Sequence, residues 1–296
     1  MKVCNIGSLN IDYVYTVDHF VQPGETTSSL CMNIFAGGKG LNQSIALARA
    51  GVEVYHAGRI GREGQFLKEM LQRAGVDVSM VQTVDDSSGH AIIQVDQNGQ
   101  NCILLHGGAN QRMDEQFVDE VLSRFENGDI LLLQNEVNML PYIVEKAHAK
   151  GMRIALNPSP FDDRLNDIAL EHIHWFILNE VEGQAFTGVS DPDEIAKCLL
   201  SRFPRAGIML TLGGAGSMYA DASGIVRQAI FPVKTVDTTA AGDTFTGYFL
   251  SGIIQGLPMP SVLRRAALAS SITVSRDGAS QSIPTLDEVM ALHLEC

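Results

Sequence analysis

From residue 113 to residue 212 the sequence alternates between longer amphipathic segments and short apolar runs. The amphipathic segments predict helices at residues 113–125, 140–150 and 192–203, and the apolar runs predict strands at residues 129–133, 153–156, 175–178 and 207–212. Helices that alternate with strands pack on both faces of a parallel sheet. The chain therefore predicts an α/β fold with a doubly wound, mainly parallel sheet flanked by helices.

Polar residues follow the predicted strands at the points where the strands end. A first buried strand, predicted at residues 1–7, is followed by Asn10 and Asp12. A carboxylate such as that of Asp12 is more commonly exposed in a loop. Strand tips in open α/β sheets are where ligands bind, so this edge of the sheet is the predicted cleft. The residues after the later strands are Glu136, Asn157, Asn179 with Glu182, and Thr211 with Gly213.

Two runs of alternating apolar and polar residues, at 90–95 and 101–106, flank Asn98 and Gly99. This pattern is a strong hairpin signal. Together with extended segments at residues 13–17 and 26–35, the hairpin predicts a small second sheet. We expect residues from about 12 to 36 and from about 88 to 108 to form a lid that excludes water from a reaction site, within a single domain of residues 1–296.

The segment GGKGLNQ at residues 37–43 leads into a predicted helix at residues 44–50 that stops at Gly51. Its glycines allow the backbone to come close to a ligand. The side chains of Lys39 and Asn42 add hydrogen-bond donors that suit sugar hydroxyls or an oxyanion. The Walker pattern of phosphate-binding loops is absent. A glycine-rich start to a helix is often only a tight turn, so this segment alone assigns no function.

The segment DTTAAGDTF at residues 237–245 lies between a predicted strand at 231–236 and a predicted helix at 240–255. Ala240, Ala241 and Gly242 have almost no side chain, so the unpaired N–H groups of the helix start can bind an anion. Asp243 falls in the first helical turn, where a carboxylate can take a proton from an incoming hydroxyl. The other interpretation of Asp243 is a helix cap, which is the usual role of Asp at such a place.

A second glycine-rich segment runs from Thr211 to Gly216 and is followed by a predicted hairpin at residues 217–230. The fingerprint of dinucleotide-binding folds requires a helix at that point. We therefore expect Thr211, Gly213 and Gly216 to form a wall beside a nucleotide whose phosphates lie elsewhere.

The overall charge and the cysteines exclude several classes of protein. A formal net charge of −13 argues against a nucleic-acid partner or an acidic membrane surface. Five cysteines without a Cys-x-x-Cys spacing indicate neither a zinc site nor a disulfide framework. The first residues are typical of a buried strand rather than a signal peptide. We expect a cytoplasmic protein with reduced thiols.

The chain resembles the ribokinase family of carbohydrate kinases over nearly its whole length. The segments that carry this resemblance are GGKGLNQ at residues 37–43 and DTTAAGDTF at residues 237–245, in that order and at about the family's separation. The resemblance implies an enzyme that uses ATP to phosphorylate the terminal hydroxyl of D-ribose, giving ribose 5-phosphate. The alternatives are a kinase for another sugar or a nucleoside (deoxyribose, a ketohexose or an adenosine-like nucleoside) and a non-catalytic sugar or nucleotide sensor.

The resemblance also implies a role for each matching residue. Asp243 matches the catalytic base, and Ala240, Ala241 and Gly242 match the anion hole for the transferred phosphate. The sugar-binding positions match Asn10, Asp12, Gly38, Lys39, Gly40, Asn42, Glu136 and Asp243. The ATP-binding positions match Asn179, Glu182, Thr211, Gly213, Gly216 and Gly242, of which Asn179 and Glu182 help to hold Mg²⁺ through water.

An activating monovalent cation, normally potassium, and a homodimer formed through the lid sheet are further implications of the resemblance. The cation ligands match Asp237, Thr239, Thr273, Arg276, Gly278 and Ser282, several of them through backbone carbonyls. The sequence departs from the family pattern at Leu41, where Ala is usual, and at Glu63 and Phe66, where Asp and Gly are usual. The change at Leu41 bears on how the sugar packs.

Overall fold

The computed structural model describes residues 1–293, and Cys296 lies outside the described residues. The main sheet consists of β1 (Val3–Ile6), β4 (Val54–Ile60), β5 (Asp77–Thr83), β8 (Ile130–Gln134), β9 (Arg153–Asn157), β10 (Ile173–Asn179), β11 (Gly207–Thr211), β12 (Ser217–Asp221) and β13 (Gly224–Gln228). Its nine strands follow the order β13-β12-β11-β10-β9-β8-β1-β4-β5. The two pairs that involve β12 are antiparallel and the remaining pairs are parallel. The predicted mainly parallel sheet is confirmed.

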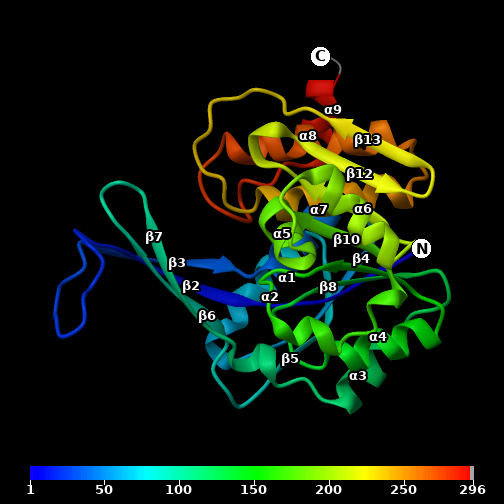
Figure 1. Cartoon of the computed structure of the whole chain (residues 1–296). Helices are drawn as coiled ribbons and strands as arrows, with labels where there is room; N and C mark the ends of the chain where they lie inside the picture. The colour runs from blue at the N-terminus through cyan, green and yellow to red at the C-terminus, as the bar shows by residue number, and fades with distance from the viewer. Residues whose placement is uncertain (294–296) are drawn as a thin grey trace.

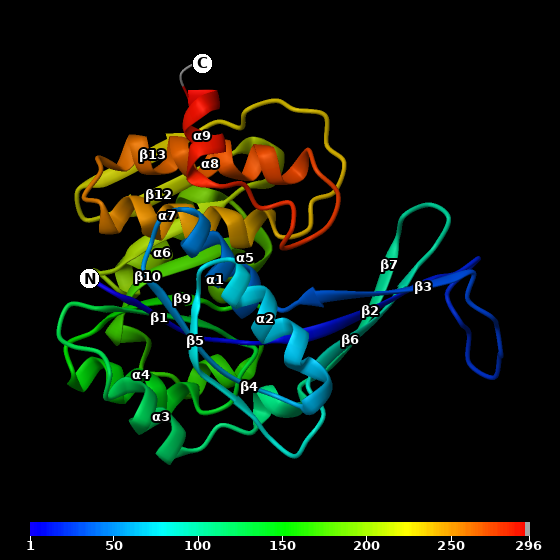
Figure 2. The same cartoon turned by 180° about the vertical axis from the view of Figure 1, so that it is seen from behind.

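Helices pack into two separate hydrophobic cores, as a doubly wound sheet requires. The first core contains α1 (Lys39–Arg49), α2 (Gln65–Arg73), α7 (Ala241–Ile254), α8 (Met259–Val274) and α9 (Leu286–His293). The second core contains α3 (Glu115–Leu122), α4 (Leu140–Ala149), α5 (Glu180–Thr187) and α6 (Pro192–Arg202). Figures 1 and 2 show the two sets from opposite sides.

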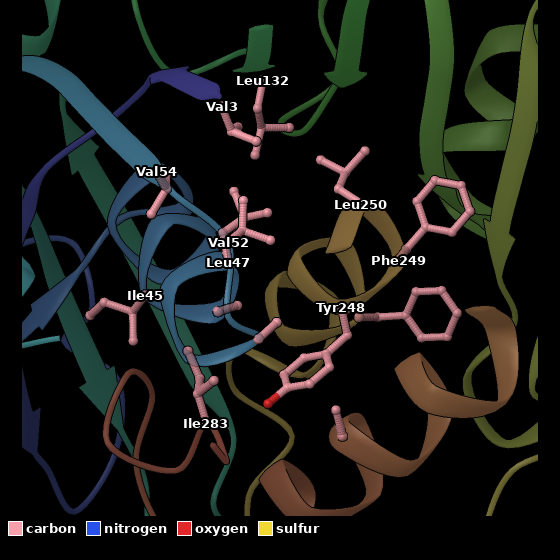
Figure 3. Packing of buried hydrophobic residues seen from close by; sticks show 14 of the residues in the cluster. Val3, Ile45, Leu47, Val52, Val54, Leu132, Tyr248, Phe249, Leu250 and Ile283 are labelled. Atoms are coloured by element: carbon pink, nitrogen blue, oxygen red, sulfur yellow. The ribbon is translucent and has the colours of Figure 1, made fainter. Parts of the chain in front are cut away.

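The close packing of α1 against α7 sets the geometry of the cleft. Figure 3 shows Leu47 of α1 in one packed core with Tyr248 and Leu250 of α7 and with Val3 and Leu132 of the sheet. All five side chains are fully buried. Because these apolar groups leave water together, the two helices are fixed against each other and against the sheet.

The strand order reverses beside β1. From β1 the chain continues to β4 and β5 on one side and then returns to β8 on the other side. Ligands bind outside the carboxyl ends of parallel strands at such a switch point. Ser8 follows β1 and Glu136 follows β8, and the Ser8 hydroxyl donates a hydrogen bond to the Glu136 carboxylate. The predicted cleft edge therefore coincides with the switch point.

A small second sheet projects from the main body (Figure 1). It consists of β2 (Asn10–Thr16), β3 (Cys31–Gly37), β6 (Gly89–Val95) and β7 (Asn101–His106), in the order β3-β2-β6-β7. The antiparallel pairing of β6 with β7 confirms the predicted hairpin. Whether this sheet acts as a lid stays a prediction.

Several elements of the structure differ from the sequence-based predictions. Residues 231–236, predicted as a strand, contain none, and Val233 and Val236 are 43% and 56% exposed. The segment lies on the surface, and the backbone N–H of Val236 donates to the carbonyl of Val274 at the end of α8, not to a strand. The strand predicted from residue 26 begins only at Cys31. The edge strand β5 and the helices α5 and α9 were missed.

Within residues 1–293 there is no helix of the length and apolar character that a membrane span requires. Four of the five cysteines fall in the same range, and all four are free thiols: Cys4, Cys31, Cys102 and Cys198.

Candidate active site

Asp243 lies in the first turn of α7 and points toward α1. Its carboxylate accepts hydrogen bonds from Nδ2 of Asn42 at 3.0 Å and from Nε2 of Gln43 at 2.9 Å. No side chain caps the start of α7, so the interpretation of Asp243 as a helix cap is wrong. Burial raises the pKa of Asp243, although Lys39 and the two amides partly oppose this effect. The result is a half-buried carboxylate whose affinity for a proton exceeds that of an exposed Asp.

The residues before Asp243 form an open helix start. Ala240 has the left-handed backbone conformation, with φ at 60°, which few non-glycine residues adopt and which often marks functional sites. A Cβ placed on Gly242 would meet no atom within 4 Å. The backbone of this turn is therefore accessible, and its N–H groups carry the positive end of the helix dipole.

A cavity of about 210 Å³ lies at the start of α7. It brings together the predicted base Asp243 and residues from three predicted sets: Lys39 from the sugar-binding set, Ala240 to Gly242 from the anion hole, and Asn179, Glu182 and Thr211 from the ATP-binding set. Asn157 and Ser159 also line it. The cavity joins the predicted phosphate site to the ends of β9, β10 and β11.

Lys39 is the first residue of α1 and lies among four carboxylates. Burial lowers its pKa, but the negative charges of Glu136, Asp243, Glu182 and Asp12 outweigh burial, so the pKa lies above the ordinary value for Lys. The ammonium is therefore charged at any physiological pH. A permanent positive charge in the cavity suits a phosphate group.

Glu136 holds the glycine-rich segment in place. Its carboxylate accepts hydrogen bonds from the Ser8 hydroxyl and from the backbone N–H of Lys39 at 3.0 Å, and it lies 3.8 Å from Nζ of Lys39. Gly40 is required beside it, because a Cβ at that position would lie 2.4 Å from the backbone nitrogen of Ser8. Gly38 has φ of 94°, which favours glycine. These contacts give Glu136 a structural role. Its contact with a sugar stays a prediction.

Asn10 and Asp12 lie at the start of β2. The Asn10 side-chain oxygen accepts a hydrogen bond from Nδ2 of Asn110 at 2.7 Å, and the buried Asn110 also binds the backbone N–H of Leu9. Asp12 is half-buried, and burial together with the charge of Glu136 raises its pKa to about 6. The structure thus places Asp12 close to Glu136, not in an exposed loop.

The Asn-x-x-Glu element at the start of α5 is a capping box. Oδ1 of Asn179 accepts from the N–H of Glu182 at 2.8 Å, and Oε2 of Glu182 accepts from the N–H of Asn179 at 3.0 Å. Both residues also line the cavity. Oxygen ligands of this kind suit Mg²⁺, so the pair fits a role in holding the ion through water.

The glycine-rich segment after β11 forms a short turn and leads into β12. Thr211 donates its hydroxyl to the carbonyl of Leu178 at 3.3 Å. Gly216 has φ of 99°, and a Cβ there would collide with the carbonyl of Gln228. A strand follows this segment in place of a helix, which confirms that it is not a dinucleotide fingerprint. Gly213 and Gly216 do not line the cavity.

The predicted cation ligands come from the segment that precedes α7 and from the end of α8 with the loop that follows it, and hydrogen bonds join these two parts. The carboxylate of Asp237 accepts from the N–H of Gly278 at 3.2 Å and from the hydroxyl of Thr239 at 2.7 Å. Burial raises the pKa of Asp237, but these hydrogen bonds outweigh burial and bring it below the ordinary value. The Arg276 guanidinium binds Glu288 at 2.6 Å, so only its carbonyl is available. The hydroxyls of Thr273 and Ser282 donate to the backbone carbonyls of Ala269 and Ala279. These two residues and Gly278 would therefore bind a hard monovalent cation through their own backbone carbonyl oxygens.

Sequence reasoning missed several residues that organise the site. Gln43 was noticed only as part of its motif, yet it binds Asp243 directly. Asn5 inside β1 and Gln134 at the end of β8 are buried amides in otherwise apolar strands, and this break in the pattern was the available signal. Among residues 1–293 no three His, Cys, Asp or Glu side chains gather as a metal cluster.

Known proteins resemble this chain over nearly its whole length. The profile of the pfkB family carbohydrate kinases matches residues 1–286. A ribokinase from Haemophilus influenzae is 35% identical over 296 residues, which cover 96% of this chain and 96% of that protein. The structure of ribokinase from Cryptococcus neoformans in complex with ADP has a TM-score of 0.85 at 33% identity and covers 99% of this chain and 100% of that one. The structure of Arabidopsis thaliana ribokinase complexed with ribose and ATP has a TM-score of 0.88 at 29% identity, and 98% of each chain is covered.

Proposed function

Since the chain belongs to the pfkB family of carbohydrate kinases, we propose that it transfers the γ-phosphate of ATP to the terminal hydroxyl of D-ribose, giving ribose 5-phosphate and ADP. The chain is an ATP-dependent sugar kinase. The observation that carries the choice of ribose is the match, over nearly the full length, to proteins named ribokinase, one of them solved with ribose and ATP.

In the proposed mechanism Asp243 is the general base. It takes the proton of the sugar's terminal hydroxyl while that oxygen bonds to the γ-phosphorus and the bond to the β-phosphate oxygen breaks. A raised pKa favours this role, because a carboxylate with a higher affinity for protons accepts one more readily. The N–H groups of Ala241 and Gly242 and the ammonium of Lys39 would stabilise the negative charge on the phosphate oxygens.

Magnesium would neutralise charge on the phosphates of ATP, and Asn179 with Glu182 would hold it through water. This proposed role is supported by the oxygen atoms of the two side chains and by their place in the lining of the cavity. A potassium ion beside Asp237 would fix the loop that precedes the anion hole. Thr239 lies directly before Ala240, so ordering the cation loop orders the first N–H groups of α7.

The proposed potassium site beside Asp237 is tested directly by measuring activation by potassium. Exchanging sodium for potassium at constant ionic strength should raise kcat, because the larger cation would complete the oxygen cage that holds residues 237–239. Initial rates of ADP formation in matched sodium and potassium buffers measure the effect. A flat response to the exchange would count against the site.

The proposed acceptor is tested by measuring ATP-dependent phosphorylation on a panel of acceptors. Ribose should give the highest kcat/KM, ahead of deoxyribose, a ketohexose and adenosine. A clear preference for one of the others would leave the kinase activity in place and would identify that compound as the acceptor instead of ribose. Binding of sugar and ATP without turnover on any acceptor would favour the sensor.

Asp12 is a proposed acceptor for sugar hydroxyls, and its environment predicts a cost to stability. Its pKa rises on folding from an ordinary 3.8 to about 6, so the folded state disfavours the charged form. Asp12→Asn should therefore stabilise the protein at pH 7 by roughly 1–2 kcal/mol, after allowance for partial exposure. The gain should vanish below pH about 4, where the carboxyl is protonated in both states, and be complete above pH about 6.

The same variant should bind ribose more weakly, because an amide accepts fewer hydrogen bonds than a carboxylate. Thermal unfolding at pH 4 and pH 7, combined with the KM for ribose at pH 7, measures both effects. An unchanged KM would remove Asp12 from the sugar site, and an unchanged melting temperature at pH 7 would contradict the burial of its charge.

The small sheet is a candidate lid and a candidate dimer interface. Its strands β2, β3, β6 and β7 extend outward from the main body (Figure 1). Exposed apolar side chains lie on them, including Met32, Ile34, Ile103, Leu104 and Leu105. Exposed apolar patches of this kind favour association, and free sheet edges favour it further. Sedimentation of the purified protein should give a dimer, and a monomer at micromolar concentration would contradict this part of the proposal.

The proposed compartment is the cytoplasm. ATP, the co-substrate, is an intracellular metabolite, and Cys31 and Cys102 are exposed free thiols, a state that the reducing cytoplasm maintains. Fractionation of cells that express the tagged chain tests this location, and recovery in a secreted fraction would contradict it.

A further inference from the structure

Three buried amide side chains form a continuous line that ends at Asp243. Asn5 lies in β1, Gln134 at the end of β8 and Gln43 in α1, and none of the three is exposed to solvent. We call these three residues the amide chain. A buried donor or acceptor left without a partner costs about 1–3 kcal/mol, so neighbouring amides have to agree in orientation.

The orientation is fixed at the end of the amide chain that lies away from Asp243. Nδ2 of Asn5 donates to the backbone carbonyl of Gly40 at 2.9 Å. A carbonyl can only accept, so the NH₂ group of Asn5 has to face it and Oδ1 has to face the other way. That oxygen accepts from Nε2 of Gln134 at 3.1 Å.

The orientation of Gln134 in turn sets the orientation of Gln43, which contacts the Asp243 carboxylate. Nε2 of Gln134 also donates to Oε1 of Gln43 at 2.7 Å, which leaves only the NH₂ group of Gln43 to face Asp243. It donates to Oδ1 of Asp243 at 2.9 Å. Both ends of the amide chain are pure acceptors, so one set of amide orientations makes every contact along it. Among the described residues, Oε1 of Gln134 is the one amide atom of the three side chains that has no hydrogen-bond partner.

We propose that Gln43 is a positioning residue for Asp243, and that Gln134 and Asn5 keep Gln43 in its donating orientation. This proposal rests on the role of Asp243 as the base. Without the amide chain the Gln43 side chain could turn its oxygen toward the carboxylate, which would repel the negative charge and release Oδ1. With the amide chain in place, Oδ1 of Asp243 keeps its hydrogen bond from Gln43, and the Asp243 side chain keeps one rotamer.

The amide chain also bears on the charge of Asp243. Burial favours the neutral carboxyl, and the negative charge of Glu136 acts in the same direction, whereas Lys39, Gln43 and Asn42 favour the ionised form. A general base has to be ionised before it can accept a proton. Removing one of the two amide donors should therefore raise the pH at which the enzyme becomes active.

The amide chain also contacts the glycine-rich segment near the start of α1. Gly40 belongs to the glycine-rich segment predicted to bind the sugar, and its carbonyl orients the amide chain. A shift of that carbonyl would move the side chains of the amide chain in turn and would so change the position of the Asp243 carboxylate. The line of amides thus connects the predicted sugar-binding segment to the base.

Single and double substitutions test the proposal in the full-length protein with ribose and ATP. Gln43→Met keeps the length of the side chain and removes the donor. It should lower kcat about tenfold, leave the KM for ribose within about twofold, and move the acid limb of the kcat profile up by about one pH unit. Gln134→Met should shift the same limb in the same direction, by less.

The double variant separates positioning from simple core packing. If Gln134 acts through Gln43, the double variant should lose no more kcat than Gln43→Met alone, whereas independent packing defects would add. Additive losses, or a Gln43→Met enzyme with the wild-type kcat and pH profile, would overturn the proposal.

Ser44→Ala is the matched control. The Ser44 hydroxyl also accepts from Asn5, at 2.8 Å, and it is equally buried. Asn5 keeps its contact with the Gly40 carbonyl in this variant, so the amide orientations are unchanged. The melting temperature should fall while the pH profile stays in place. A shifted profile in Ser44→Ala would count against the directional argument.

Two further variants keep the test decisive. If Gln43→Met does not fold, the near-isosteric Gln43→Glu preserves an acceptor for Gln134 and places a second carboxyl beside Asp243, which should move the acid limb further upward. Asp243→Asn is measured in parallel. An active Asp243→Asn enzyme would refute the proposed base, whereas an inactive one beside a normal Gln43→Met enzyme would refute only the role of Gln43.

Discussion

Replacing Asp243 with Asn should lower kcat for ribose phosphorylation by ~10²-fold or more, because an amide cannot accept the proton of the attacking hydroxyl. Binding of the sugar should largely survive, since the other predicted sugar-binding residues are unchanged, although the new NH₂ group has to face one of the two amide donors of Asn42 and Gln43. Initial rates together with calorimetric titration of ribose separate the two effects.

Asp287→Asn is the matched control for this change. Asp287 also lies in the first turn of a helix, α9, but it is exposed and lies outside the cavity. Its substitution should leave kcat and ribose affinity unchanged. Equal turnover in Asp243→Asn and the wild-type enzyme would remove Asp243 from the role of base.

Replacing Gly247 with Ala should destabilise the protein by about 1–3 kcal/mol, the usual cost of overpacking a dense core. A Cβ on Gly247 would lie 2.4 Å from Cβ of Ala46 and 2.8 Å from the backbone nitrogen of Leu47. The helices α1 and α7 therefore have to move apart. Since α1 carries Asn42 and Gln43 and α7 carries Asp243, the separation should also lengthen both amide contacts to the carboxylate and lower kcat.

Gly242→Ala, five residues earlier in the same helix, provides the comparison. A Cβ there meets nothing within 4 Å, so the melting temperature should not fall. The methyl group would instead occupy space beside the proposed anion hole and lower kcat. Chemical denaturation and initial rates on both variants measure the contrast. A Gly247→Ala protein as stable as the wild type would show that the helices can repack without cost.

Much of the fold could be predicted because it depends on local patterns. The alternation of helices and strands from residue 113 onward identified the parallel sheet, and Asn98-Gly99 identified the hairpin. The failures occur where local pattern and environment disagree. Residues 231–236 are apolar enough for a strand, yet no neighbouring strand is there to pair with them. The edge strand β5 is too polar to show a clear period.

The candidate site was predicted in part. Asp243, Lys39 and the Ala240 to Gly242 segment were found from their motifs, and the structure brings them into one cavity with Asn179, Glu182 and Thr211. The buried positions of Asn110, Gln134 and Asn5 could not be assigned a purpose. Asn110 pairs with Leu9 across 101 residues of sequence and Gln134 pairs with Asn5 across 129, and no local pattern specifies such a pair.

The sequence by itself determined the class of fold and the residue types available for phosphoryl transfer, because periodicity, glycine content and helix starts are local properties of the chain. Only the tertiary structure decided the state of Asp243. Its two amide partners lie 201 and 200 residues away in the sequence, and they reach it because α1 and α7 pack closely at Gly247. Burial, hydrogen-bond partners and neighbouring charges set the proton affinity of a carboxylate, and all three arise only when distant segments meet.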